Sequence, residues 1–253
     1  MSRSGIGAVA LATALLGAVA SASADPMPAG PVSAEMLAAL EADQIMMFGG
    51  TDLWRAGGFL HGGFAWAPDG LAQDGLVLKV LAGAGTYQYR NGTTQIYAAH
   101  ALGTVAPGWI FRHDRFIAVA YAGPDIQYHW TLPADLGNPL RGTHAGVRLG
   151  IETWWEPLPD TMVKAAGSWS SVGGSYALQA AFGWRVLEPL FGGVYVGPEL
   201  QAFGDDTYRQ LRAGVHVTAW RLGPYEWSAG MGWVTDSDDR AGAYVRLGVL
   251  TKQ

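Results

Sequence analysis

Apolar and polar residues alternate with a period of two along much of this chain. In the segment 175–187, SYALQAAFGWRVL, one set of alternate positions carries apolar side chains, and the other carries small, polar or charged ones. Successive side chains of a β-strand point to opposite sides of the sheet. The segment therefore predicts a strand with one apolar face and one polar face.

About twelve segments of this kind follow one another, most of them roughly ten to fifteen residues long, which is enough for a tilted strand to cross a membrane. They are Ile45–Trp54, Gly57–Trp66, Gly75–Tyr89, Thr94–Phe111, Arg115–Tyr128, Gly142–Trp155, Thr161–Ser171, Ser175–Val186, Phe191–Phe203, Tyr208–Trp220, Tyr225–Val234 and Ala241–Leu250. Turn-forming pairs such as Asn91-Gly92 and Gly173-Gly174 separate them. Because no linker interrupts the series, we expect residues 45–253 to form one domain.

Two architectures could use such strands. A soluble sandwich or barrel would pack the apolar face inward, whereas an outer-membrane barrel turns it toward lipid and encloses a polar lumen. The polar face favours the second, because it is rich in glycine and mixes both signs of charge. An even number of strands also allows the sheet to close. Aromatic residues gather near strand ends, as in an interfacial girdle: Trp54, Trp66, Trp109, Phe111, Trp155, Trp184, Trp220 and Trp233. The predicted fold is all-β, a single antiparallel up-and-down transmembrane β-barrel of about twelve strands.

The first residues have the character of an export signal. Arg3 precedes the apolar run Ile6–Val19, and Ala22-Ser23-Ala24 fits a cleavage site for small residues. We expect a signal peptide over 1–24 and export to the outer membrane. A retained membrane anchor is the alternative, which the shortness of the run disfavours. Residues 25–44 are expected to form a periplasmic leader with a short helix over Ser33–Glu41.

Composition supports this interpretation. Only 15% of the residues are charged, whereas about a quarter is usual in soluble proteins. The net charge of −5 is not clustered, so no nucleic-acid partner is indicated. The chain has no cysteine, which excludes disulfides and thiolate metal sites. We expect neither a cofactor nor a metal ion.

Charged residues on the polar face are the first candidates for a functional site, because they could meet in the lumen. They are Lys79, Arg148, Glu152, Lys164, Arg185, Glu199, Arg212, Glu226 and Arg246. Opposite charges on neighbouring strands could pair and close part of the bore. Alternatively, the basic members could form a selectivity lining for a polar or acidic solute.

A second candidate is the polar turn after the ninth segment. Asp205 and Asp206 fit a tight turn, and Arg209 or Arg212 could pair back to them. Such a turn could simply be paired with itself, or it could serve in docking or gating.

An enzyme is the competing function. His144, His216, Ser168 and Ser170, together with Glu152 or Glu199, provide the residue types of a Ser–His–acid site. However, no G-x-S-x-G elbow and no metal-ligand spacing is present. We therefore predict a protein without catalytic residues.

Several blocks of sequence resemble one family. They are Phe48-Gly49-Gly50-Thr51-Asp52-Leu53-Trp54, Gly62-Gly63 with Trp66, Ala122-Gly123-Pro124-Asp125-Ile126-Gln127, Gly197-Pro198-Glu199 with 204–212, Glu226-Trp227-Ser228-Ala229-Gly230 and 242–248. Together they are similar to the cellulose-biosynthesis BcsS family of alphaproteobacteria over nearly the whole mature chain. The resemblance implies membership of a bacterial cellulose synthesis and secretion system at the outer membrane, and it brings no catalytic residues with it.

The predicted function is thus a non-enzymatic outer-membrane barrel that assists cellulose biosynthesis or export, through a polar lumen or a docking surface. The expected partners are the cellulose synthesis and secretion machinery, outer-membrane lipid and, if the lumen is open, a glucan chain. A hydrolase or acyl-modifying enzyme of envelope lipid or glycan remains one alternative. Another is a scaffold barrel whose loops, such as Thr131–Arg141 and Asp236–Arg240, bind a partner.

Overall fold

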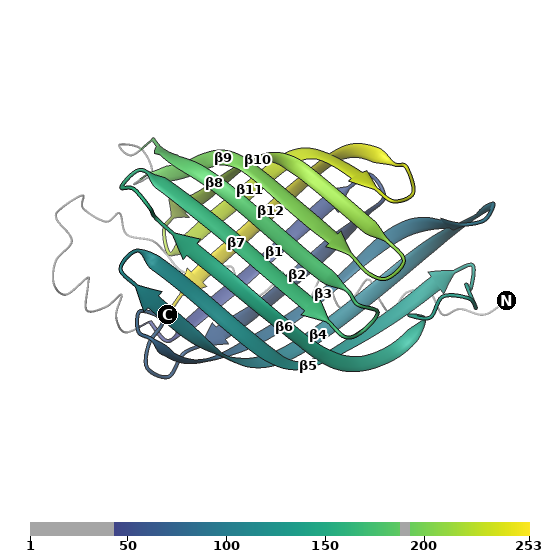
Figure 1. The fold of residues 1–253 in the computed structure, drawn as a ribbon, viewed down its shortest axis with the longest axis horizontal. Coiled ribbons are helices and arrows are strands. Elements are labelled where there is room, and N and C mark those ends of the chain that lie inside the picture. Colours follow the sequence, from purple (N-terminus) through teal and green to yellow (C-terminus); the bar gives the residue numbers. More distant parts are fainter. Residues whose placement is uncertain (1–42, 188–192) are drawn as a thin grey trace. The chain divides into compact units, whose positions relative to one another are not determined.

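The computed structural model describes residues 43–187 and 193–253, and these form a closed antiparallel barrel of twelve strands (Figure 1). Neighbouring strands follow chain order, and the last strand pairs with the first. The strands are β1 (Ile45–Trp54), β2 (Gly57–Trp66), β3 (Gly75–Asn91), β4 (Thr94–His113), β5 (Phe116–Leu132), β6 (Gly142–Trp155), β7 (Thr161–Ser170), β8 (Tyr176–Val186), β9 (Val194–Gly204), β10 (Arg209–Leu222), β11 (Tyr225–Asp236) and β12 (Ala241–Lys252). The predicted fold class is confirmed. The expected signal peptide and leader helix lie outside the described residues.

The described part of the chain contains no helix with the length and apolarity that a membrane crossing requires.

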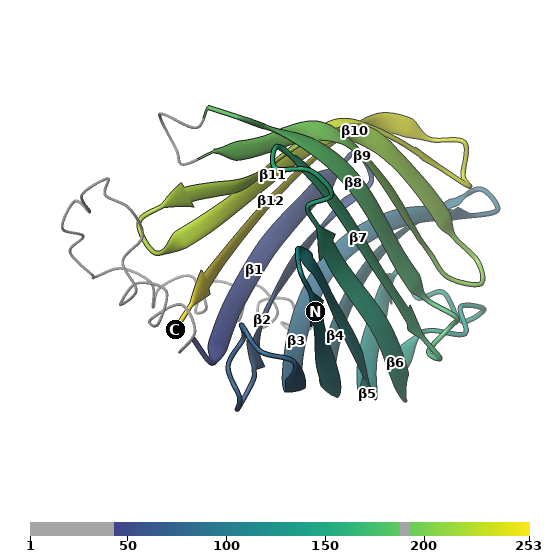
Figure 2. The ribbon, with the colours of Figure 1, turned by 60° about the vertical axis from the view of Figure 1, so that its left-hand side comes forward.

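The barrel has two distinct ends. Ile45 and Gln253 meet at one of them, which we call the terminus end, where the Gln253 N–H donates to the Ile45 carbonyl over 2.8 Å. The opposite end, which we call the loop end, carries the connections 55–56, 92–93, 133–141, 171–175, 205–208 and 237–240. At 17 and 20 residues, β3 and β4 extend past their expected ends. A membrane strand needs only about 9–11 residues, so this hairpin projects beyond the rest of the wall (Figure 2).

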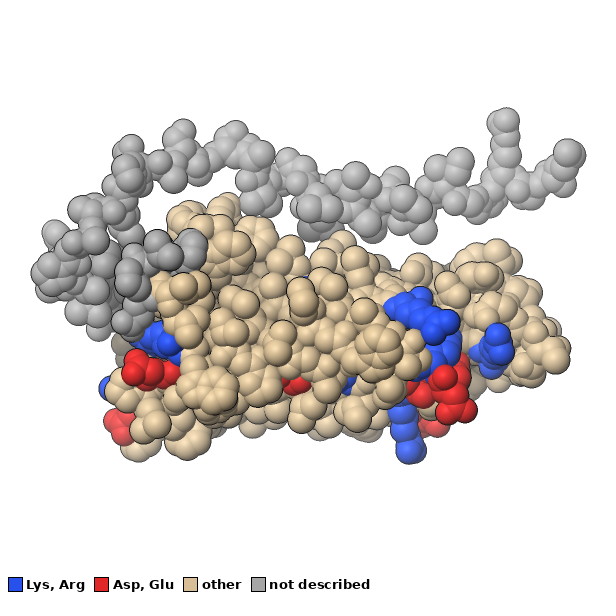
Figure 3. All heavy atoms as spheres, turned by 90° about the horizontal axis from the view of Figure 1, so that it is seen from above, with Lys and Arg blue, Asp and Glu red and all other residues tan. Residues whose placement is uncertain are grey.

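The outward face is apolar, as the alternation predicts. On β6, Val147, Leu149 and Ile151 point outward and are about half exposed, while Arg148 between them is buried in the interior. Figure 3 shows one face of the molecule on which charged side chains gather toward the two ends and leave the middle almost uncharged. An apolar band of this extent around a closed barrel with a polar interior belongs in lipid.

Aromatic side chains mark both edges of this band. The outward-facing aromatics near the terminus end are Trp66, Trp109, Phe111, Phe116, Trp155 and Trp184, and those toward the loop end are Tyr97, Tyr128, Trp130, Trp169 and Trp233. Trp54 was expected among them, but that assignment is wrong. Its ring lies in the interior, with the centroid 4.9 Å from the guanidinium of Arg212.

An irregularity in β10 changes the face of one more tryptophan. The register with β11 shifts between Val217 and Trp220, where Ala219 has a φ of +63°. Strict alternation from Val217 would place Trp220 on the interior face. The bulge instead sets it opposite Trp227, on the outward face.

Glycine on the inward face provides room for rings. A Cβ on Gly83 would lie 2.4 Å from the ring of Phe59, and one on Gly150 would lie 2.2 Å from the ring of Tyr121. Both rings therefore lie directly against the backbone of the wall. This packing explains why the polar face predicted from the sequence is so rich in glycine.

The interior at the terminus end is apolar, which the alternation did not predict. Its buried residues are Ala65, Ala67, Val77 and Ile110, against which Met46, Leu71, Ile117 and Val119 pack. The β2–β3 connection, residues 67–74, is held over this cluster, because the Leu71 carbonyl accepts a bond of 2.5 Å from Arg112 Nη2. The Leu71 N–H also donates to the Asp43 carbonyl over 2.7 Å.

Candidate functional site: the barrel interior and its loop end

Arg148 lies in the most completely bonded cluster of the interior. Its Nε and Nη2 donate to the two carboxylate oxygens of Asp125 over 3.1 and 3.0 Å. Thr104, Gln127 and Ser170 also donate to Asp125, over 2.6, 2.8 and 2.6 Å. Asp125 is fully buried. Since each of its oxygens accepts several bonds, the cluster has the character of a structural tie between β5 and β6.

Glu199 and Arg246 pair across two intervening strands. Arg246 Nη2 lies 2.6 Å from Glu199 Oε2, although β10 and β11 separate their strands. Tyr244 donates to the other carboxylate oxygen over 2.8 Å. Gly230 makes the pair possible, because a Cβ there would lie 2.3 Å from Glu199 Oε1. The pair therefore crosses the lumen. We call an ion pair of this kind, between strands that are not neighbours, a chord.

Arg212 forms a second chord. Its Nη1 donates to Asp52 of β1 over 2.8 Å, although β11 and β12 lie between the two strands. The rings of Trp54, Phe203 and Tyr244 surround the guanidinium, with centroids 4.9, 4.6 and 5.3 Å away. Aromatic faces attract a cation at such distances. Arg212 is consequently almost completely buried.

A third chord joins β3 to β6. Lys79 pairs with Glu152, and the Lys79 ammonium also lies over the rings of Phe48 and Tyr121, at 5.2 and 4.7 Å. β4 and β5 separate the two strands.

Two further candidates, Arg185 and Glu226, lie toward the terminus end. Arg185 donates to Tyr195 and lies 3.7 Å from Glu156. Glu226 lies 3.7 Å from Arg221, whose side chain is 73% exposed. Glu226 therefore lies at the rim and takes no part in the three chords.

Lys164 differs from the other basic residues of the interior. Among the described residues it forms no ion pair or hydrogen bond, although Glu152 and Glu199 lie within electrostatic range. Both carboxylates are already bonded to Lys79 and Arg246. It is thus the basic residue of the candidate set whose side chain has no bonded partner within the described part of the chain.

The acidic partners Asp52 and Asp125 were not among the residues expected to meet in the lumen. Asp52 lies two positions before Trp54, and Asp125 lies two positions before Gln127, so each shares the inward face of its strand with that residue. The alternation could have shown that both acidic side chains point inward. It could not have shown which basic residue each of them would pair with.

The polar turn 205–208 is held mainly by its first aspartate. Asp205 Oδ1 accepts bonds from Thr207 N, Thr207 Oγ1 and Tyr208 N, over 2.7, 2.7 and 2.9 Å. The Arg209 N–H donates to Ser237 Oγ over 3.1 Å, which ties the turn to the connection 237–240. Burial, followed by the negative charge of Asp236, raises the pKa of the Tyr208 phenol.

The Asp206 N–H donates to the Gly173 carbonyl over 3.0 Å. This bond brings the connection 205–208 against the connection 171–175.

The long connection 133–141 is fastened to β3. Tyr89 Oη donates to Asp135 Oδ2 over 2.7 Å, and Asn91 Nδ2 donates to Asp135 Oδ1 over 3.1 Å. The hydrogen bond from Tyr89 is the main reason that the pKa of the Asp135 carboxyl lies below its ordinary value.

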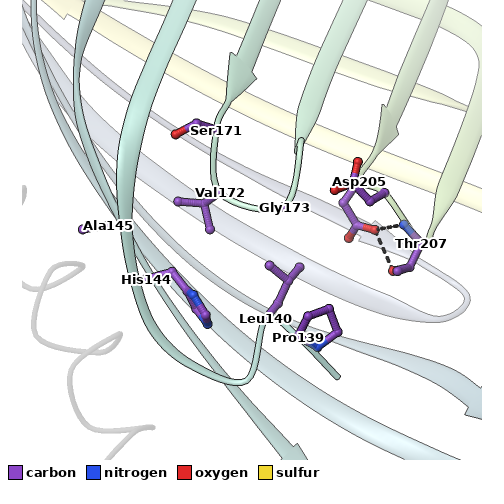
Figure 4. A pocket seen from close by; sticks show the side chains of 10 residues that line it. Pro139, Leu140, His144, Ala145, Ser171, Val172, Gly173, Asp205 and Thr207 are labelled. Atoms are coloured by element: carbon purple, nitrogen blue, oxygen red, sulfur yellow. Dashed lines mark hydrogen bonds between the residues drawn. The ribbon is translucent and has the colours of Figure 1, made fainter. Parts of the chain in front are cut away.

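A pocket of about 280 Å³ lies where these loop-end connections converge (Figure 4). Its lining residues are Pro139, Leu140, His144, Ala145, Ser171, Val172, Gly173, Asp205, Asp206 and Thr207. We call this cavity the mouth pocket.

The residues proposed for a hydrolytic site are not brought together. His144 lines the mouth pocket, whereas His216 is buried on β10, four strands away in the barrel order. His216 is bonded through both ring nitrogens, to Thr218 Oγ1 at 2.9 Å and to the Phe182 carbonyl at 3.1 Å. Within residues 43–187 and 193–253, no group of three or more His, Asp or Glu side chains is placed to hold a metal ion.

Comparison with known proteins gives one family. A family described as cellulose biosynthesis protein BcsS matches residues 46–253. No curated protein matches the chain.

Several solved structures are similar in fold. The KdgM porin has 10% identity and a TM-score of 0.43, over 81% of this chain and 98% of its own. The translocator domain of the autotransporter NalP from Neisseria meningitidis has 12% identity and a TM-score of 0.48, over 86% and 92%. LpxR from Salmonella typhimurium has 11% identity and a TM-score of 0.44, over 81% and 99%.

Proposed function

The chain belongs to the cellulose biosynthesis protein BcsS family, which implies a role in cellulose biosynthesis, and on that premise we propose a non-enzymatic outer-membrane barrel that assists cellulose production through its loop end. The observation that carries the proposal is the contrast between a bore crossed by ion pairs and a pocket formed at the loop end. Three ion-pair chords cross the bore, and an apolar cluster lies beneath them. The mouth pocket is open to the loop-end surface.

The outer membrane follows from the solvent that the barrel surface requires. Large apolar side chains face outward on all sides of the closed sheet, between two sets of aromatics. A closed barrel satisfies its backbone hydrogen bonds within lipid, and this design is typical of bacterial outer membranes. Lipid is therefore one partner, and the proposed export signal would bring the chain to it.

The ion pairs that cross the bore favour docking over conduction. A twelve-stranded barrel has a narrow bore, and here Arg212, Glu199 and Asp125 are almost completely buried inside it. A glucan chain passing through would have to separate these charge pairs, and the buried members would lose their partners in a place that water hardly reaches. We therefore place the contact with the cellulose machinery, or with the emerging glucan, at the loop end.

Planar bilayers test the closed lumen. We expect the refolded protein to insert without steady ionic conductance. Gln at Arg212 should allow measurable current, because it removes one chord and leaves Asp52 unpaired, while Gln at exposed Arg221 should not. A stable ohmic conductance from the unaltered protein would contradict the closed lumen.

The unbonded side chain of Lys164 favours the alternative function, a selective conduit. Its free ammonium would make such a pore prefer anions. In that case the unaltered protein conducts, and replacing Lys164 by Gln lowers its preference for chloride over potassium in a salt gradient.

The cellular role is tested by restoring cellulose in a strain that lacks this chain. The unaltered gene should raise surface cellulose, measured by dye binding and by acid hydrolysis. A strain whose cellulose does not depend on the chain would exclude the proposal.

A further inference from the structure

We propose that the mouth pocket binds one sugar ring of a neutral glucan chain. The inference rests on the proposed function and gives the loop end a ligand of stated chemistry.

The pocket is a formed cavity, because its loops are tied by specific bonds. Ser171 and Val147 exchange two of them: the Ser171 N–H donates to the Val147 carbonyl over 2.9 Å, and the Val147 N–H donates to Ser171 Oγ over 3.0 Å. The bond from Asp206 to Gly173 closes the next side. A ligand would meet walls that are already in place.

Two glycines allow the loops to approach so closely. Gly173 and Gly174 both have a φ of +60°, a conformation that glycine adopts without strain. A Cβ on Gly173 would lie 2.6 Å from Leu140, and one on Gly174 would lie 2.6 Å from the Asp206 carboxylate. The backbone thus forms the floor on which Leu140 and Asp206 face the cavity.

The polar groups of the lining have hydrogen-bonding capacity to spare. Among the described residues, no donor is bonded to the Asp206 carboxylate. The Asp205 bonds all go to Oδ1, so Oδ2 is left as an acceptor. His144 uses one ring nitrogen, 3.3 Å from the Arg141 carbonyl. Carboxylates and an imidazole are suitable partners for hydroxyl groups, which donate and accept.

The remaining lining defines the class of ligand further. Leu140, Val172 and Pro139 present aliphatic surface, which suits the C–H face of a sugar ring. Within the part of the chain that the structure describes, no Lys or Arg lines the pocket, so a ligand with carboxylates or phosphates would meet uncompensated negative charge. The volume of about 280 Å³ lies just below the range of about 300–1,000 Å³ that is usual for ligand pockets. One ring fits this size better than an extended chain segment.

The test is binding of cellotetraose to the refolded full chain in detergent, measured by isothermal titration calorimetry. The test variant is Asp206→Asn, which keeps the shape of the side chain and removes its charge. The matched control is Asp239→Asn in the connection 237–240, where the φ of 57° suits Asn as well as Asp. Heat-modifiable migration on gels checks that each variant is folded. If Asp206→Asn does not fold, His144→Gln replaces it.

We expect the unaltered chain and Asp239→Asn to bind cellotetraose alike, and Asp206→Asn to bind it about tenfold more weakly, since it loses hydrogen bonds to a charged acceptor. The acidic sugar tetragalacturonate should bind more weakly than cellotetraose. The inference is overturned if the unaltered chain does not bind cellotetraose, if Asp206→Asn binds it equally well, or if the pocket binds Ca²⁺ and no sugar. Restored cellulose without sugar binding would refute this inference alone, whereas cellulose that is independent of the chain would refute the proposed function.

Discussion

The buried pair of Asp125 and Arg148 allows a quantitative test of how the interior is stabilised. Replacing Asp125 by Asn keeps its shape but leaves the Arg148 guanidinium buried without a counter-charge. Removing one partner of a buried ion pair costs about 3–5 kcal/mol. The upper part of that range is expected here, because Asp125 is fully buried and both of its oxygens accept from Arg148.

A double variant separates the charge from the shape. Asn at 125 together with Gln at 148 leaves two neutral amides that can still bond to each other and to Thr104 and Ser170. We expect it to be more stable than Asp125→Asn alone, with a coupling of about 2 kcal/mol, within the range for groups in one network. Glu226→Gln is the control: its partner Arg221 is largely exposed, so the cost should be about 0–1 kcal/mol.

Stability is measured by guanidinium unfolding of the barrel in lipid vesicles, followed by tryptophan fluorescence and extrapolated to zero denaturant. A cost of Asp125→Asn no larger than that of Glu226→Gln would contradict a buried, charge-paired Arg148. Effects of the two interior changes that simply added would contradict it as well.

Three further predictions follow from other parts of the barrel. Gly230→Ala should lower the free energy of unfolding by about 1–3 kcal/mol, because its Cβ would collide with Glu199. Gly103→Ala should be tolerated, since a Cβ there meets no atom within 4 Å; the same unfolding assay compares the two variants. Val215→Arg should cost about 2–4 kcal/mol in lipid, since this side chain is 55% exposed on the outward face, and equal stability would show that Val215 does not meet lipid. The pKa of the Asp135 carboxyl is lowered, so the stabilisation that its hydrogen bonds give to the connection 133–141 is complete above about pH 4, the ordinary pKa of Asp. This stabilisation is lost as the pH falls through the lowered pKa. Pepsin at graded acidity should therefore cut the connection only in that low pH range.

Local chemistry was sufficient to predict the strands and their outward faces. The alternation in 175–187 requires no knowledge of neighbouring strands, because the side-chain period of two belongs to the strand itself. Turn-forming pairs such as Asn91-Gly92 likewise placed the breaks. Leu178 and Trp184 belong to the apolar set of the segment 175–187, and the structure shows both exposed on the outward face.

The partners inside the barrel were beyond such reasoning. Arg212 was considered as a partner for the nearby turn 205–208, yet it pairs with Asp52, 160 positions away in the chain. The alternation along each strand shows that both side chains face inward. It does not show which inward side chains lie at the same level along the barrel axis. That depends on the tilt and stagger with which all twelve strands close.

The order of residues along each strand is enough to assign lipid to one side of the sheet and a polar interior to the other, because alternation is a property of successive residues. The folded barrel was needed to show which charges pair, that Trp54 lies inside over Arg212, and that three separate connections enclose one pocket. Those features depend on closure of the barrel, which brings together residues that no local pattern relates.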